Sequence, residues 1–253
     1  MGCAGGFPVF CDAMSDRIGR RQWEAMFAEA AASIRREHRR LSELDSIGGD
    51  GDHGATMLRV VEQMERMERS GEAGSGQPPD SNRDGGLGDL LRSSGWRVLS
   101  VDGGASSALL GALLTGMAES VARPDAAGAD ASPETMDCRG LADALEAGLR
   151  AVSRLTAAKP GDKTMMDALV PAVLAVRAAA DEDKSIAAAM REAAQAAQRG
   201  AEATRELTAR YGRAKHLGDR TKGHPDAGAV SIALLFLGFS RALTDGVEIR
   251  LTP

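Results

Sequence analysis

Apolar residues recur every three or four positions along most of the chain, with charged residues between them. From Arg17 to Leu44 this spacing is typical of one face of a long amphipathic helix. An element beginning at Trp96 runs through Gly103-Gly104 into an apolar helix that ends near Val121. Further helical stripes cover residues 55–67, 141–155, 165–176 and 186–207, and residues 229–243 are apolar enough for a buried helix. We therefore predict seven or eight helices.

No stretch alternates convincingly between apolar and polar residues, as a half-exposed strand does. Residues 247–251 alternate weakly but have no partner strand. Most connections between the predicted helices are short enough to join antiparallel neighbours. We expect one all-α domain over residues 17–253.

Three stretches interrupt the helical pattern. Residues 71–88 contain six glycines and Pro78-Pro79, which is typical of a flexible surface loop. Residues 124–133 are rich in Ala, Gly and Asp and predict a second loop. Residues 1–16 predict a loose N-terminal extension that lacks the basic start of a secretory signal.

The composition narrows the class of protein. With 43% hydrophobic and 26% charged residues, the 253-residue chain resembles an ordinary soluble globular protein. A net charge of -5 gives no reason to expect nucleic acid as the main partner. The best apolar run, residues 229–237, is shorter than the roughly 18 residues of a membrane span, so we expect no membrane partner. Three cysteines without a CxxC pair favour a reduced, cytoplasmic location and no zinc site.

Candidate chemistry is densest between the first two predicted helices. Asp45, Asp50 and Asp52 are separated by glycines, which allow a turn tight enough for the carboxylates to converge. Converging carboxylates repel one another unless a cation neutralises them, and oxygen ligands select Mg²⁺ or Ca²⁺. The alternative is an acidic loop that only caps the next helix.

Two familiar motifs do not fit this loop. Residues 49–54 match GxGxxG, but a polar helix end precedes them instead of a strand. A calcium loop starting at Asp50 would place Val61 where a bidentate glutamate is needed. A carboxylate–metal loop leading into a helix N-terminus remains, and such a terminus favours phosphate.

Three other stretches have the character of ligand loops. Residues 102–107 form a small-residue turn before a helix and could cradle phosphate, although helices also pack through such residues. Residues 160–167 offer several capping side chains, which a purely structural helix start would also explain. Residues 212–228 are basic and polar, so they are either a solvated loop or the positive side of a phosphotransfer site.

Together these stretches resemble the nucleotide-binding L subunit (Dak2 or DhaL domain) of dihydroxyacetone kinases. The resemblance is carried, in the family's order, by LDSIGGDGDHGATM, GGASSALLG, PGDKTMMDAL and GRAKHLGDRTKGHPDAGA. It implies an antiparallel barrel of about eight helices with the nucleotide site at one end.

The resemblance also implies roles for individual residues. Asp45, Asp50 and Asp52 match the aspartates that hold two Mg²⁺ ions and serve catalysis. The nucleotide, ADP or ATP, would be bound by His53, Gly54, Ala55, Thr56, Ala105, Ser106, Leu109, Thr156, Met165, Arg213, Asp226, Ala227 and Gly228. Within this set, Leu109 and Met165 would sandwich the adenine. Ser107 and Thr156 stand where the family usually has glycine, and Thr56 replaces an Asn.

The implied activity is phosphoryl transfer to a short ketose such as dihydroxyacetone. In the family a separate K subunit holds the ketose, so we expect this chain to be active only with that partner. One form of the family keeps ADP bound, and a phosphohistidine protein of the phosphotransferase system rephosphorylates it; we expect this form. The alternatives are an ATP-dependent kinase that exchanges its nucleotide, a related fatty-acid kinase, and a nucleotide-loaded regulatory or docking subunit.

Overall fold

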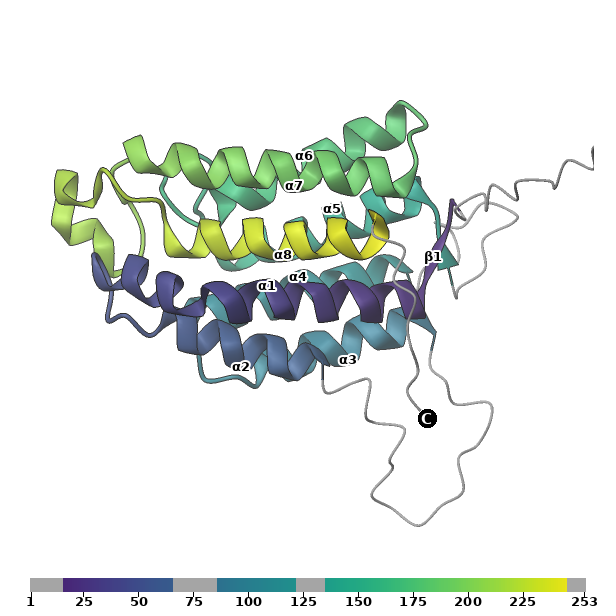
Figure 1. Cartoon of the computed structure of the whole chain (residues 1–253), viewed down its shortest axis with the longest axis horizontal. Coiled ribbons are helices and arrows are strands. Elements are labelled where there is room, and N and C mark those ends of the chain that lie inside the picture. Colours follow the sequence, from purple (N-terminus) through teal and green to yellow (C-terminus); the bar gives the residue numbers. More distant parts are fainter. Residues whose placement is uncertain (1–15, 66–85, 122–134, 245–253) are drawn as a thin grey trace, which may run out of the picture.

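Eight α-helices make up most of the computed structural model, which describes residues 16–65, 86–121 and 135–244 (Figure 1). They are α1 (Arg20–Ser46), α2 (His53–Glu65), α3 (Leu87–Leu99), α4 (Gly104–Val121), α5 (Cys138–Leu155), α6 (Met166–Asp181), α7 (Ile186–Ala203) and α8 (Ala227–Thr244). Two 3₁₀ segments, η3 (Thr204–Glu206) and η4 (Arg213–Thr221), lie between α7 and α8. The predicted all-α fold class is confirmed.

The longest helix shows why the sequence forms these elements. In α1, Trp23, Phe27, Ile34 and Leu41 are fully or almost fully buried, at intervals of four and seven residues that return to one helix face. The first turn is closed by the Gly19 N–H, which donates to the Gln22 side chain at 3.0 Å.

The helices pack side by side with their long axes roughly aligned (Figure 1). Each helix contacts the next along the chain, and α8 packs against both α7 and α1. The backbones of α8 and α1 approach closely, since a Cβ at Gly238 would lie 2.4 Å from the Ala30 backbone nitrogen. The first and last of the described helices are therefore neighbours.

Because successive helices run in opposite directions, alternate loops meet at the same end of the molecule (Figure 1). Residues 47–52, 100–103, 156–165 and 204–226 lie at one end. The opposite end carries a short antiparallel pair, β1 (Ile18–Gly19) with β2 (Thr135–Met136), in which Ile18 pairs with Met136. The sequence pattern did not predict this pair, because two-residue strands are too short to show alternation.

The predicted boundaries need three corrections. α3 begins at Leu87, inside the expected 71–88 loop and well before the expected start at Trp96, and residues 100–103 separate it from α4. Its buried face includes Ser94 and Gly95, which obscure the apolar stripe. α7 ends at Ala203 instead of residue 207, because a 3₁₀ turn follows it. The rest of the 71–88 loop, the 124–133 loop, residues 1–15 of the expected extension and residues 247–251 lie outside the described residues.

Among the described helices, α8 is the one long and apolar enough to cross a membrane, with a mean hydropathy of 1.6 over 18 residues. This segment is longer than the 229–237 run taken from the sequence, because the helix continues through Ser240 and Arg241. Of this 18-residue segment, 56% is buried inside the protein. The core helices of globular proteins can be equally long and apolar.

Candidate active site

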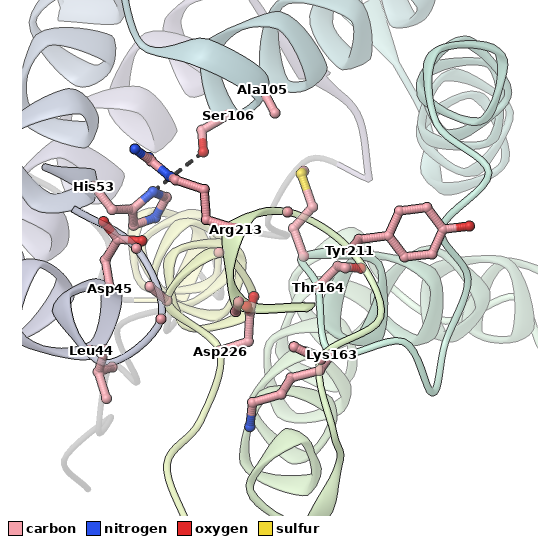
Figure 2. A pocket seen from close by; sticks show the side chains of 18 of the residues that line it. Leu44, Asp45, His53, Ala105, Ser106, Lys163, Thr164, Tyr211, Arg213 and Asp226 are labelled. Atoms are coloured by element: carbon pink, nitrogen blue, oxygen red, sulfur yellow. Dashed lines mark hydrogen bonds between the residues drawn. The ribbon is translucent and has the colours of Figure 1, made fainter. Parts of the chain in front are cut away.

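A cavity of about 680 Å³ opens at the end of the molecule where the four loops meet (Figure 2). Its walls come from the end of α1 and the start of α2, the start of α4, the loop between α5 and α6, and the segment from residue 209 to the start of α8. Segments far apart in the sequence therefore share one site. This volume is in the usual range for small-molecule sites.

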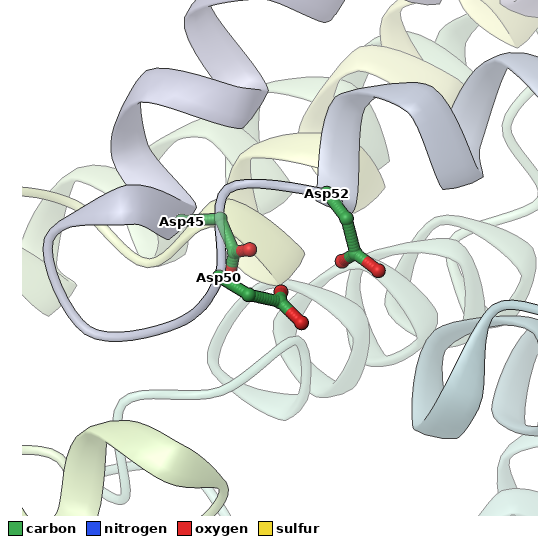
Figure 3. A group of neighbouring side chains, drawn as sticks. All are labelled: Asp45, Asp50 and Asp52. Carbon is green, nitrogen blue, oxygen red and sulfur yellow. The ribbon is translucent and has the colours of Figure 1, made fainter.

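Three carboxylates face the cavity from one turn of chain (Figure 3). Asp45 lies in the last turn of α1, Asp50 in the following loop, and Asp52 directly before α2. The Gly51 N–H donates to Asp45 Oδ2 at 2.9 Å, and Gly51 has a φ of +77°, which glycine adopts without strain. One oxygen from each aspartate lies within 4.8 Å of the others, so the convergence expected from the spacing is present.

The carboxylates of this cluster repel one another, and a positive charge beside them is favourable. The hydrogen bond from Arg213 holds the pKa of Asp50 below its usual range, while burial and the neighbouring Asp50 and Asp45 raise the pKa of Asp52. Arg213 Nη1 donates to Asp50 Oδ2, and its Nη2 lies 3.9 Å from Asp52 Oδ1. The three carboxylates offer the hard oxygen donors that Mg²⁺ prefers, so the residues present fit this ion.

His53 links the aspartate loop to two other helices. His53 is 8% exposed, and its Nε2 bonds to Ser231 of α8 at 2.6 Å. Its Nδ1 bonds to Ser106 of α4 at 3.3 Å (Figure 2). Burial lowers the pKa of His53, which favours a neutral ring. The ring is therefore held between α4 and α8 at the edge of the cavity.

The starts of two helices lie at the wall of the cavity. α2 begins at His53, immediately after Asp52, and α4 begins at Gly104, beside Ala105 and Ser106. Helix N-termini favour anions through their free backbone N–H groups and the helix dipole. Positive helix ends beside a carboxylate cluster suit a metal-bound polyphosphate.

Part of the cavity lining is apolar. Leu109, Met165 and Ala158 line it, together with Tyr211, whose side chain is partly exposed. These groups come from α4, the loop before α6 and the segment before η4. An apolar wall of this kind suits a flat aromatic group.

A buried lysine joins the loop before α6 to the segment between α7 and α8. Lys163 has a φ of +61°, and its Nζ donates to the backbone oxygens of Thr204 at 2.5 Å and His224 at 2.6 Å. Asp226 is the N-terminal cap of α8, because its Oδ2 accepts from the Ala229 N–H at 2.8 Å. Burial raises the pKa of Asp226 to about 6. These bonds hold the chain on either side of residues 205–223.

Comparison with known proteins identifies the family. Residues 47–241 match the DAK2 domain. The chain belongs to the DAK2 domain family. The chain is 32% identical over 196 residues to the ADP-binding subunit DhaL of a PEP-dependent dihydroxyacetone kinase from Listeria innocua, covering 78% of this chain and 83% of that one. The Escherichia coli subunit of the same description is 32% identical over 199 residues, covering 77% and 83%.

Longer kinases contain a similar segment. The D-erythrulose kinase of Mycolicibacterium smegmatis is 35% identical over 222 residues, which are 86% of this chain but only 34% of the kinase. The crystal structure of the dihydroxyacetone kinase of C. freundii superposes with a TM-score of 0.63 at 23% identity, covering 95% of this chain and 38% of that one. At this level of identity, the similarity to the C. freundii structure supports the fold alone.

Most of the residues singled out in the sequence line the cavity of this DAK2 domain. They are Asp45, Asp50, Asp52, His53, Thr56, Ala105, Ser106, Leu109, Thr156, Met165, Arg213, Asp226, Ala227 and Gly228. Gly54 and Ala55 do not line it. Gly54 packs against α1, where a Cβ would lie 1.9 Å from the His38 carbonyl oxygen, and Ala55 is exposed.

Sequence reasoning did not single out Lys163, Thr164 and Tyr211, which also line the cavity of the DAK2 domain. Lys163 and Thr164 lie inside the PGDKTMMDAL stretch, so the motif located them without indicating a role. Tyr211 is the single tyrosine of the chain and directly precedes the basic stretch, but one aromatic residue is a weak signal. Ser231, the partner of His53, lies among apolar residues of α8 and has no signal of its own in the sequence.

Proposed function

We propose that this chain is the ADP- or ATP-binding subunit of a dihydroxyacetone-type kinase and passes a phosphoryl group to a short ketose. The observation that carries the proposal is the convergence of Asp45, Asp50 and Asp52 at one side of a nucleotide-sized cavity. The support from relatives is a match to ADP-binding DhaL subunits over more than three quarters of the chain.

Each part of a magnesium nucleotide has suitable residues. Asp45, Asp50 and Asp52 would hold Mg²⁺, and two ions fit the number of carboxylate oxygens. When bound, Mg²⁺ neutralises the charge that develops on the transferred phosphoryl group. The helix starts at His53 and Gly104 would bind phosphate oxygens through backbone N–H groups.

The remaining part of the cavity would hold the base and close over it. Leu109 and Met165 would offer an apolar surface to the adenine, and Thr156 also lines the cavity. Arg213, paired with Asp50 in this structure, would contact the phosphates once Mg²⁺ takes over the aspartates. The start of α8, with Asp226, Ala227 and Gly228, forms the cavity edge that approaches the nucleotide.

The ketose and the phosphoryl donor would come from partner proteins. A K subunit would hold the ketose, and a phosphohistidine protein of the phosphotransferase system would recharge bound ADP in the cytoplasm. The relatives described as PEP- or PTS-dependent DhaL subunits are matched over 83% to 92% of their length, whereas the erythrulose kinases are about three times as long as the matched segment. The match over most of these DhaL subunits supports the DhaL form, and an exchanging ATP kinase is the alternative. A nucleotide-loaded regulatory subunit would show binding but no transfer.

Calorimetric titration of ADP and ATP into nucleotide-stripped protein tests the proposal, first with Mg²⁺ and then with EDTA. We expect tight, Mg²⁺-dependent ADP binding that survives dialysis. Similar affinities for ADP and ATP of micromolar order would instead identify an exchanging kinase. An absence of Mg²⁺-dependent binding would overturn the proposal.

A pair of aspartate variants makes the test specific. Asp50→Asn removes one ligand charge and is expected to weaken Mg²⁺-dependent nucleotide binding by at least about tenfold. Asp219→Asn is the matched control, because Asp219 is exposed, pairs with Lys222 and lies outside the cavity lining. Equal losses in both variants would show that general surface charge is responsible. Ketose phosphorylation by the isolated chain would overturn the requirement for a K subunit.

A further inference from the structure

A chain of side-chain hydrogen bonds crosses three helices behind the cavity. Ser231 Oγ of α8 bonds to the Ala227 carbonyl oxygen at 3.0 Å and to His53 Nε2 at 2.6 Å. The other ring nitrogen, Nδ1, bonds to Ser106 Oγ at 3.3 Å. Ser231 is 2% exposed and does not line the cavity, whereas His53 and Ser106 do.

The direction of every hydrogen bond in this chain follows from one end. The Ala227 carbonyl can only accept, so the single hydrogen of the Ser231 hydroxyl points to it. If that hydrogen pointed to His53 instead, two oxygens would face each other at 3.0 Å with no hydrogen between them. Ser231 Oγ therefore accepts from His53, and Nε2 carries the ring hydrogen.

The other side of the ring is then determined as well. A neutral histidine with hydrogen on Nε2 has an unprotonated Nδ1 that can only accept. Ser106 must donate its hydroxyl hydrogen to this nitrogen, which holds the hydroxyl at the start of α4. A buried serine on α8 thus controls a hydroxyl group that faces the cavity.

We infer that Ser231 is a positioning residue that fixes the orientation and Nε2–H tautomer of His53, and through it the hydroxyl of Ser106, for ligand binding. The role in nucleotide binding rests on the proposed function. The tautomer itself does not, because it is a property of the nucleotide-free chain.

Nitrogen NMR of the full, nucleotide-free chain tests the tautomer. The spectrum of the ¹⁵N-labelled protein is recorded at about pH 8, well above the ordinary imidazole pKa of about 6.5. The chain has 4 histidines, and the His53 signals are those missing from a His53→Gln variant. We expect Nε2 protonated and Nδ1 unprotonated in the wild type, and a mixture of tautomers in Ser231→Ala. A wild-type ring with hydrogen on Nδ1 would overturn the inference.

Nucleotide affinity tests the positioning role. Removing one partner of a buried hydrogen bond is expected to weaken Mg²⁺–ADP binding by about tenfold in Ser231→Ala. Ser231→Thr keeps an oxygen at this position and should restore both the tautomer and the affinity. Ser240→Ala is the matched control, a buried serine of the same helix outside the cavity, and should leave both unchanged.

The outcomes separate the two proposals. If the wild type binds no nucleotide, the proposed function fails, and the NMR result still decides the tautomer. If Ser231→Ala changes the tautomer but binds Mg²⁺–ADP like the wild type, the positioning role is refuted while the proposed function stands. A thermal unfolding curve for each variant verifies that the loss of affinity occurs in folded protein.

Discussion

The closest backbone approach near the aspartate cluster predicts a large effect of one methyl group. Gly54 is the second residue of α2, and a Cβ built on it would lie 1.9 Å from the His38 carbonyl oxygen and 2.6 Å from Ser42 Oγ of α1. The Ser42 side chain can rotate away, but the carbonyl belongs to the backbone of α1. Gly54→Ala therefore forces α1 and α2 apart or unwinds the first turn of α2.

The size of the effect follows from this distance. Ordinary van der Waals contacts begin at 3.4 Å, so the two backbones must separate by about 1.5 Å. Overpacking of this kind costs roughly 1–3 kcal/mol. At about 2–4 °C per kcal/mol for a domain of this size, we expect Tm to fall by about 5 °C. Because Asp52 and His53 immediately precede Gly54, the same displacement should weaken Mg²⁺ and nucleotide binding.

Urea and thermal unfolding of Gly54→Ala, followed by calorimetry of the folded variant, measure both effects. Gly88→Ala is the matched control, since Gly88 is also the second residue of a helix and a Cβ there would meet Val121 Cγ1 at 3.7 Å, an ordinary contact. The control should gain up to about 1 kcal/mol from helix propensity. If Gly54→Ala were as stable as the wild type and bound Mg²⁺ equally well, the argument from helix contact would be refuted.

Two further predictions concern the loop between α5 and α6 and the segment between α7 and α8. Because burial raises the pKa of Asp226 to about 6, the folded chain binds this proton more tightly than the unfolded chain, whose carboxyl titrates near 3.9. The contribution to stability is present below about pH 4 and is lost as the pH rises through about 6, by roughly 3 kcal/mol. Asp226→Asn should remove that loss, and urea unfolding of both proteins across this range measures the difference. Lys163→Met leaves the carbonyls of Thr204 and His224 without a buried donor and should lower the unfolding free energy by about 1–3 kcal/mol and weaken nucleotide binding. Urea unfolding and calorimetry check it against Lys159→Met, which changes an exposed lysine outside the cavity, and equal behaviour of the two variants would contradict the role of Lys163.

The features that could be predicted from the sequence depend on neighbours along the chain. Apolar residues spaced by three or four positions defined the helices, because a helix repeats its face every 3.6 residues whatever surrounds it. Asp45, Asp50 and Asp52 could be expected to converge because a loop with several glycines turns back within a few residues. The four stretches that carry the family resemblance could also be recognised, because each is a continuous run of residues and all four follow the family's order.

The weaker predictions were those in which a local pattern depends on distant packing. The apolar stripe of α3 was hard to recognise because its buried face includes Ser94 and Gly95. Gly95 is buried because it packs against Thr115 of α4. Gly54 was expected at the nucleotide, but its lack of a side chain is explained by contact with α1. Neither partner helix can be identified from the residues next to these positions.

The sequence by itself determined which segments are helical, except for most of α3, which loop carries the carboxylates and which family the chain resembles. The tertiary structure alone decided that Lys163 joins its loop to both ends of the segment between α7 and α8, and that Ser231 holds His53. His53 and Ser231 are 178 positions apart, and they meet because α8 packs beside α1 and α2. Helix formation is governed by local hydrogen bonds and spacing, whereas contacts between loops and buried side chains are determined by how all the helices pack together.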